Sequence, residues 1–223
     1  MIRMLRLALA ATLLLTPLAH AQGGRKAKLA VRFLAERVPA GIEEVELVAA
    51  ESRSEPFGLP TNHLSEPREV PARSFGIAPA GKSTSLATVT LPAEGSDFIV
   101  MLIPGDKGFH PVVIPAKDPT FRPGDVYFFN NADKTVLGYV GSAKFSLEPG
   151  KGRSLRPAGA RREGFYDVGF GVKEKEGNRA LSTTRWPVEE NMRSYVFFFV
   201  NPTTKRPDFR AVDEFVPPDK PAR

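Results

Sequence analysis

Four residues, Gly76, Gly81, Lys82 and Ser83, match the phosphate-binding motif G-x-x-x-x-G-K-[ST]. Such a loop holds a nucleotide only when a strand precedes it and a helix follows it, because the N–H groups of the helix bind the phosphates. Here residues 85–91 alternate polar and apolar side chains, which predicts a strand. We therefore predict a Gly-Lys turn that leads into a strand, and we keep nucleotide binding as a remote alternative.

Few side chains are available for metal or nucleophilic chemistry. The chain has no cysteine and three histidines, His20, His63 and His110. A blue-copper centre needs two histidines and a cysteine, and a Ser-His-Asp triad would depend on one isolated histidine. We predict no catalytic constellation, no metal site and no cofactor.

Acidic side chains are numerous enough for one kind of catalysis. Glycoside hydrolysis needs only two carboxyl groups on either side of a cleft. The sequence offers six candidates without ranking them: Glu43, Glu44, Asp125, Asp167, Asp213 and Glu214. A carboxylate-based glycan hydrolase is therefore the alternative function.

Residues 181–195 combine the single tryptophan of the chain with arginines. Arg185 and Trp186 are adjacent, and Arg193 closes the segment. Trp and Arg are enriched at recognition hot spots, so this segment is a candidate binding site for a sugar ring or an acidic group. The alternative is that Trp186 fills the end of a β-sandwich and an arginine caps it.

Residues 150–164 form the densest basic stretch of the sequence. Lys151, Arg153 and Arg156 lie within it and are further binding candidates. From residue 118 to the C-terminus, 18 basic residues face 14 acidic ones, whereas residues 22–117 are balanced. This excess favours an anionic partner, although it also serves solubility alone.

The elements that must position these residues are short strands. Apolar and polar residues alternate in many short runs, for example over residues 28–33, 87–91 and 166–172, and proline and glycine are scattered between them. A period of two predicts strands with one buried face, and their regular spacing is typical of sandwiches and barrels. We predict an all-β protein with one or two immunoglobulin-like antiparallel β-sandwich domains.

Three runs, residues 97–104, 125–131 and 194–202, are apolar in both phases. Strands of this kind are covered on both faces. We expect a neighbouring domain or a loop to cover the second face, and an exposed aromatic platform is the alternative.

The first and third of these runs are each followed by proline, a lysine-containing turn and phenylalanine. This echo predicts two related β-units. We place the first domain at residues 22–117, with a proline-rich insertion at 52–71, and the second at 118–216. Residues 217–223 form a flexible tail.

The N-terminus has the pattern of a secretory signal. Arg3 and Arg6 precede a short apolar run, and Ala19-His20-Ala21 suits a signal peptidase. We predict a signal peptide over residues 1–21 and a periplasmic or secreted protein. The run is too short for an ordinary membrane span, and no other apolar stretch reaches that length.

The segments PGDVYFFN, TRWPV followed by RSYVFFF, and FRAVDEF resemble those of uncharacterised secreted β-proteins of Gram-negative bacteria. The resemblance implies an exported β-sandwich and no particular activity. We expect a non-enzymatic protein that acts by binding or assembly in the cell envelope. Its expected partner is an envelope glycan, an anionic surface or another protein, and not a nucleic acid.

Overall fold

In the computed structural model, which describes residues 28–50 and 52–218, the chain is all-β. None of the described residues is helical, and none forms a helix long and apolar enough to cross a membrane. The expected leader, residues 1–21, and the last five residues of the expected tail lie outside the described part. The strands are β1 (Ala30–Ala35), β2 (Val45–Ala49), β3 (Ser52–Arg53), β4 (Arg68–Glu69), β5 (Ser74–Pro79), β6 (Ala87–Thr90), β7 (Asp97–Gly105), β8 (Gly108–Pro115), β9 (Val126–Asn131), β10 (Val136–Val140), β11 (Ala143–Leu147), β12 (Gly152–Leu155), β13 (Phe165–Glu174), β14 (Gly177–Pro187), β15 (Met192–Val200) and β16 (Pro207–Phe215).

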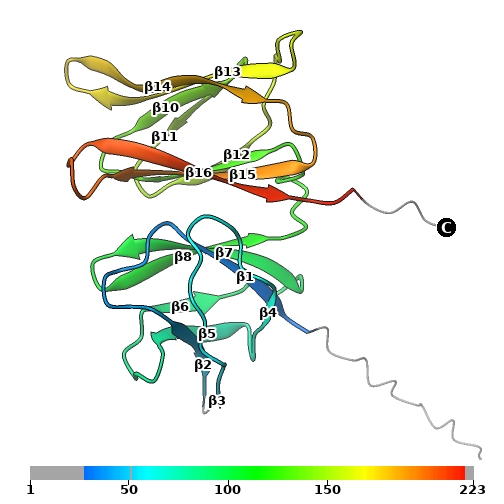
Figure 1. Cartoon of the computed structure of the whole chain (residues 1–223), viewed down its shortest axis with the longest axis vertical. Helices are drawn as coiled ribbons and strands as arrows, with labels where there is room; N and C mark the ends of the chain where they lie inside the picture. The colour runs from blue at the N-terminus through cyan, green and yellow to red at the C-terminus, as the bar shows by residue number, and fades with distance from the viewer. Residues whose placement is uncertain (1–27, 51, 219–223) are drawn as a thin grey trace, which may run out of the picture.

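The strands form four sheets that lie in four layers (Figure 1). The first outer sheet has the order β3-β2-β5-β6, and the first inner sheet β4-β1-β7-β8. The second inner sheet has the order β12-β9-β15-β16, and the second outer sheet β11-β10-β13-β14. The first two sheets come from residues 30–115 and the other two from residues 126–215, which we call the first and second halves.

The two halves repeat one strand order, since adding eight to each strand number of the first half gives the second. β1 is parallel to β7, and β9 is parallel to β15, whereas the remaining pairs are antiparallel. The predicted β-sandwich class is confirmed by this arrangement. The immunoglobulin-like character and the proposed domain boundaries are finer statements and stay predictions.

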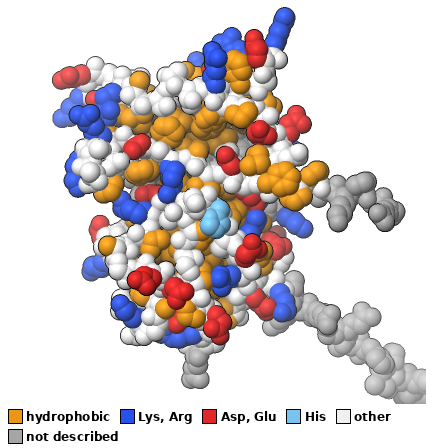
Figure 2. All heavy atoms as spheres, in the orientation of Figure 1, with side chains coloured by type: hydrophobic (Ala, Val, Ile, Leu, Met, Phe, Trp, Pro, Cys, Tyr) orange, Lys and Arg blue, Asp and Glu red, His pale blue; other side chains and the backbone are white. Residues whose placement is uncertain are grey.

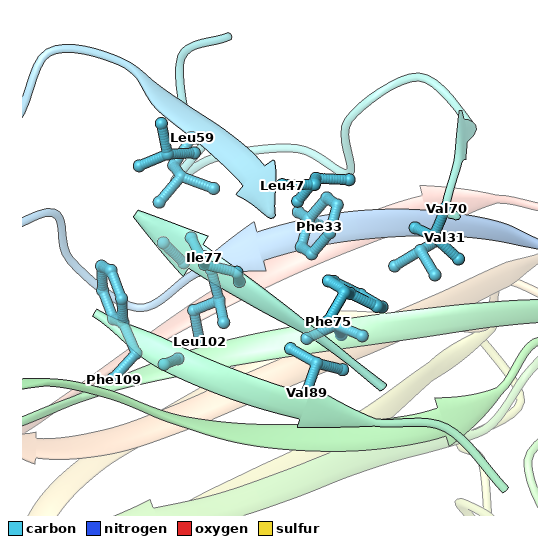
Figure 3. Packing of buried hydrophobic residues seen from close by; sticks show 14 of the residues in the cluster. Val31, Phe33, Leu47, Leu59, Val70, Phe75, Ile77, Val89, Leu102 and Phe109 are labelled. Carbon is cyan, nitrogen blue, oxygen red and sulfur yellow. The ribbon is translucent and has the colours of Figure 1, made fainter. Parts of the chain in front are cut away.

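Each half has its own apolar core between an outer and an inner sheet. In the first half, Phe33, Phe75 and Ile77 point toward one another from β1 and β5 (Figure 3). In the second half, Phe128, Phe170 and Phe198 pack together from β9, β13 and β15. β-Branched and aromatic residues suit such half-buried pleated surfaces, which is why these sequences form strands.

A third core lies between the two inner sheets. It contains Ile99 and Met101 of β7 and Tyr195 and Phe197 of β15, all at most 1% exposed. This core explains why the runs at residues 97–104 and 194–202 are apolar in both phases: one face lies in a sandwich and the other meets the opposite half. The expectation that another part of the chain covers these strands is confirmed.

The proline-rich segment at residues 52–71 is held against the first half. The backbones of Val45 and Phe57 exchange two hydrogen bonds, and the Ala35 N–H donates to the Pro60 carbonyl. Phe57, Leu59 and Val70 are buried in the first core. The segment therefore covers one side of the first sandwich as an ordered loop.

Candidate functional site

The segment with the phosphate-binding motif is a turn between two antiparallel strands. Residues 80–86 join β5 to β6, so no helix begins after Lys82. The Gly81 N–H donates to the Glu46 carboxylate at 3.1 Å. A hydrogen bond from Arg53 and this backbone hydrogen bond lower the pKa of Glu46 below its ordinary value. The Gly81 N–H, which a phosphate would need as a donor, is therefore already bound to the Glu46 carboxylate. The prediction of a turn followed by a strand is confirmed.

The basic candidates at residues 150–164 do not form one site. Lys151 lies in the turn before β12, Arg153 lies on that edge strand, and both are exposed. Arg156 instead folds over Gly124 and donates to the Asp125 carboxylate at 2.9 Å. Only Arg156 of the three therefore has a fixed position beside another functional group.

Arg193 lies in a buried ion network between the two halves. Its side chain donates to both oxygens of Glu214, at 3.0 and 2.9 Å, and to the Ala116 carbonyl at 2.7 Å. Arg32 and the Tyr195 hydroxyl donate to the same carboxylate. Burial alone would raise the pKa of Glu214, but the hydrogen bonds and charges of its partners lower it below its ordinary value.

This network forms the floor of a groove of about 1010 Å³ between the halves. Among the described residues, four basic and four acidic side chains line the groove, so their formal charges cancel. Arg193 and Glu214 satisfy each other and are 3% and 8% exposed. The network therefore joins the halves, and Arg193 is a structural residue in this fold.

Arg185 and Trp186 point to opposite sides of the second outer sheet. The Arg185 guanidinium lies 4.6 Å from the centre of the Phe165 ring and 3.9 Å from the Asp167 carboxylate, on the outside. Trp186 packs against the second core, with its ring 5.7 Å from that of Phe170. The three sequence candidates of this segment thus lie in three different environments.

Trp186 nevertheless lines a cleft, because it closes the core incompletely. The cleft has a volume of about 340 Å³ and lies between the two sheets of the second half, near the end of β14. We call it the aromatic cleft. On the face drawn in Figure 2, hydrophobic side chains gather between the two sheets of the second half.

Two aromatic residues form one wall of the aromatic cleft. Tyr166 of β13 and Trp186 of β14 are directly paired across their antiparallel strands, so their side chains lie side by side on one face. Both are partly buried. They present an aromatic surface at the mouth of an otherwise apolar core.

Polar groups of the second inner sheet form the facing wall. Ser194 of β15 is paired with Val126 on one side and with Asp213 on the other. The Ser194 hydroxyl donates to the Asp213 carboxylate at 2.6 Å. The cleft therefore places hydrogen-bonding groups opposite two aromatic rings.

The first half offers a comparison for this end of the cleft. There Val31 of β1 pairs with Phe98 of β7, whereas in the second half Val126 of β9 pairs with Ser194 of β15. Phe98 is 1% exposed and fills its core. Ser194 is small and lines the aromatic cleft, so it does not fill the second core as Phe98 fills the first.

Asp125 lies at the deep side of the aromatic cleft and has both carboxylate oxygens engaged. One accepts from Arg156 and the other from the Arg122 N–H at 2.8 Å. Asp213 and Glu189 lie at the exposed part of the lining. No group of three or more metal-ligating side chains is found within residues 28–50 and 52–218.

The cleft combines predicted residues with others that sequence reasoning missed. Trp186 was a binding candidate, and Asp125 and Asp213 were candidate acids, whereas Tyr166 and Ser194 were not singled out. Ser194 carried a signal, since it is the polar residue in the inward phase of a strand that continues with Val196 and Phe198. No family model matches this chain, and no curated protein sequence matches it.

Proposed function

We propose that this chain is a non-enzymatic binding protein of the bacterial cell envelope and that it holds a glycan in the aromatic cleft. The signal-like N-terminus supports export, and the cleft supports binding. The observation that carries the proposal is the pairing of Tyr166 and Trp186 opposite Ser194 and Asp213.

The chemistry of the two walls suits a sugar ring. The C–H groups on one face of a pyranose pack against aromatic rings, which also offer a polar atom at their edge. Hydroxyl groups around the ring donate to carboxylate oxygens, and they also donate to the Ser194 oxygen, whose own proton goes to Asp213. A cleft of about 340 Å³ lies at the small end of the range for small-molecule sites, as expected for one ring of a longer chain.

Binding is favoured over hydrolysis by the contacts and the exposure of the acids in the cleft. A glycoside hydrolase needs one carboxyl group that donates a proton to the leaving oxygen. Both carboxylate oxygens of Asp125 are engaged, one by the Arg156 guanidinium and the other by the Arg122 N–H. Asp125 is therefore held in place by other groups of the chain, and the remaining cleft acids, Asp213 and Glu189, lie on the exposed part of the lining.

Isothermal calorimetry against a panel of soluble oligosaccharides tests the proposal. Ser194→Phe introduces a large ring into the cleft, and we expect it to abolish binding. Trp186→Ala is expected to weaken binding by about tenfold or more, as at an aromatic hot spot. Arg185→Ala, on the outer face of the same strand, is the matched control and should bind like the wild type.

Two results would remove the proposal. One is wild-type affinity in a folded Ser194→Phe variant, and the other is the absence of binding to any glycan on the panel. A reducing-sugar assay runs alongside the calorimetry. Steady release of new reducing ends by the wild type, lost in Asp213→Asn, would replace binding by hydrolysis.

A further inference from the structure

The charge of the aromatic cleft narrows the class of glycan, an inference that rests on the function proposed above. Among residues 28–50 and 52–218, three acidic side chains line the cleft, Asp125, Glu189 and Asp213, and no basic side chain does. Arg156 touches Asp125 from outside and balances its charge. Two carboxylates therefore remain unbalanced around a cavity with an aromatic wall.

The nearby arginines do not change this balance. Arg185 is turned to the outer face of its sheet, where it lies beside Asp167. Arg193 faces the opposite half and is bound to Glu214. Strand alternation fixes both directions, because each arginine is adjacent in sequence to a residue that faces the cleft.

The net positive charge of the whole chain does not determine the charge inside the cleft. The formal charge of +6 is spread over the whole molecule, and two of its arginines belong to the expected leader. At physiological ionic strength, exposed charges more than about 8 Å apart are largely screened. The groups that line the cleft therefore decide the sign of the charge that it accepts.

A cation suits both features of the site at once. The face of a tryptophan or tyrosine ring attracts an ammonium group, and carboxylates within a few ångströms add to this attraction. We infer that the aromatic cleft selects glycans with free amino groups, of the glucosamine type, over their N-acetylated counterparts. Both carry the same ring, and only the free amine is charged.

Calorimetry with glucosamine oligomers and N-acetylglucosamine oligomers of equal length tests this selectivity. The titrations are made at mildly acidic pH, where the sugar amine is protonated and ordinary carboxyl groups are ionised. We expect the free-amine oligomer to bind roughly tenfold more tightly, and its affinity to fall as salt is added.

The outcomes separate the inference from the function on which it rests. Equal affinity, or tighter binding of the acetylated oligomer, overturns the inference and leaves glycan binding in place. If neither oligomer binds but a different, neutral glycan does, the inference is likewise overturned and glycan binding stays in place. No glycan binding at all removes both.

A charge variant supplies the second test. Asp213→Asn keeps an acceptor for the Ser194 hydroxyl and removes one negative charge, so we expect the preference for the free amine to fall several-fold. Glu176→Gln, in the exposed turn between β13 and β14 at the far end of these strands, is the matched control. The inference would be contradicted if Asp213→Asn kept the full preference for the free amine. It would also be contradicted if the preference of the wild type did not change with salt.

Discussion

Replacing Glu214 by glutamine tests how strongly buried charges join the two halves. The Glu214 carboxylate is 8% exposed and accepts hydrogen bonds from Arg193, Arg32 and Tyr195. Glutamine keeps the size of the side chain but leaves two guanidinium groups without a counter-charge. Removing one partner of a buried ion pair costs about 3–5 kcal/mol, and each kcal/mol lowers the Tm of a chain of this length by about 2–4 °C. We therefore expect a Tm roughly 10 °C below that of the wild type.

Differential scanning calorimetry measures this shift. Asp167→Asn is the control, because Asp167 pairs with Arg161 on the surface, where the two side chains are 35% and 62% exposed. Exposed pairs contribute at most about 1 kcal/mol, so the control should melt within a few degrees of the wild type. A Glu214→Gln variant no less stable than the control would refute the view that this network holds the halves together.

The same network predicts the direction of a pH effect. The pKa of Glu214 in the folded protein lies below its ordinary value, because the hydrogen bonds and charges of its partners outweigh the effect of burial. Its stabilising contribution is therefore present above the ordinary carboxyl pKa and is lost as the pH falls through the folded value. We expect the difference in Tm between wild type and Glu214→Gln to shrink in acid.

Further predictions concern single residues. Burial raises the pKa of Glu36 above its ordinary value, so stability is lost as the pH rises from the unfolded pKa through the folded pKa. Glu36→Gln should therefore be more stable than the wild type in urea unfolding at neutral pH, and this gain should disappear in acid. Phe98→Ala should cost about 3–5 kcal/mol in the same assay, whereas a loss below about 1 kcal/mol would mean that Phe98 does not fill the first core. Gly141 has a φ of 62°, and an added Cβ would lie 1.8 Å from the Ala158 carbonyl oxygen, so Gly141→Ala should cost about 2–4 kcal/mol. Gly150→Ala, with a φ of 72° and open space, should cost about 1 kcal/mol, and equal losses at the two glycines would contradict the predicted clash.

The sequence predicted the strands and their covered faces because both follow from local periodicity. Residues 194–200 are apolar in both phases, and the structure places one phase in the second core and the other between the halves. Which surface covers a strand depends on tertiary packing, so the sequence left a domain, a loop and an exposed platform open. The structure of the phosphate-like motif also followed from local sequence, since the alternation after Ser83 predicts a strand and not a helix.

The candidate site was harder to predict because it depends on register between distant strands. Trp186 was recognised by its type, but its neighbour Tyr166 becomes visible only when β13 and β14 are paired. Arg193 and Ser194 are adjacent and face opposite sheets, and the sequence does not say which face is the cleft. Arg193 was therefore grouped with Trp186, although it contacts Glu214 of the neighbouring strand on the face that meets the first half.

Tryptophan fluorescence during a glycan titration tests the central claim most directly. The chain has one tryptophan, Trp186, and it lines the proposed site, so its emission reports on the cleft alone. We predict that a bound glucosamine oligomer shifts or quenches this emission along a saturable curve that matches the calorimetric affinity, and that Ser194→Phe shows no such curve. Saturable binding by calorimetry with unchanged Trp186 emission would place the ligand elsewhere and contradict the proposed site.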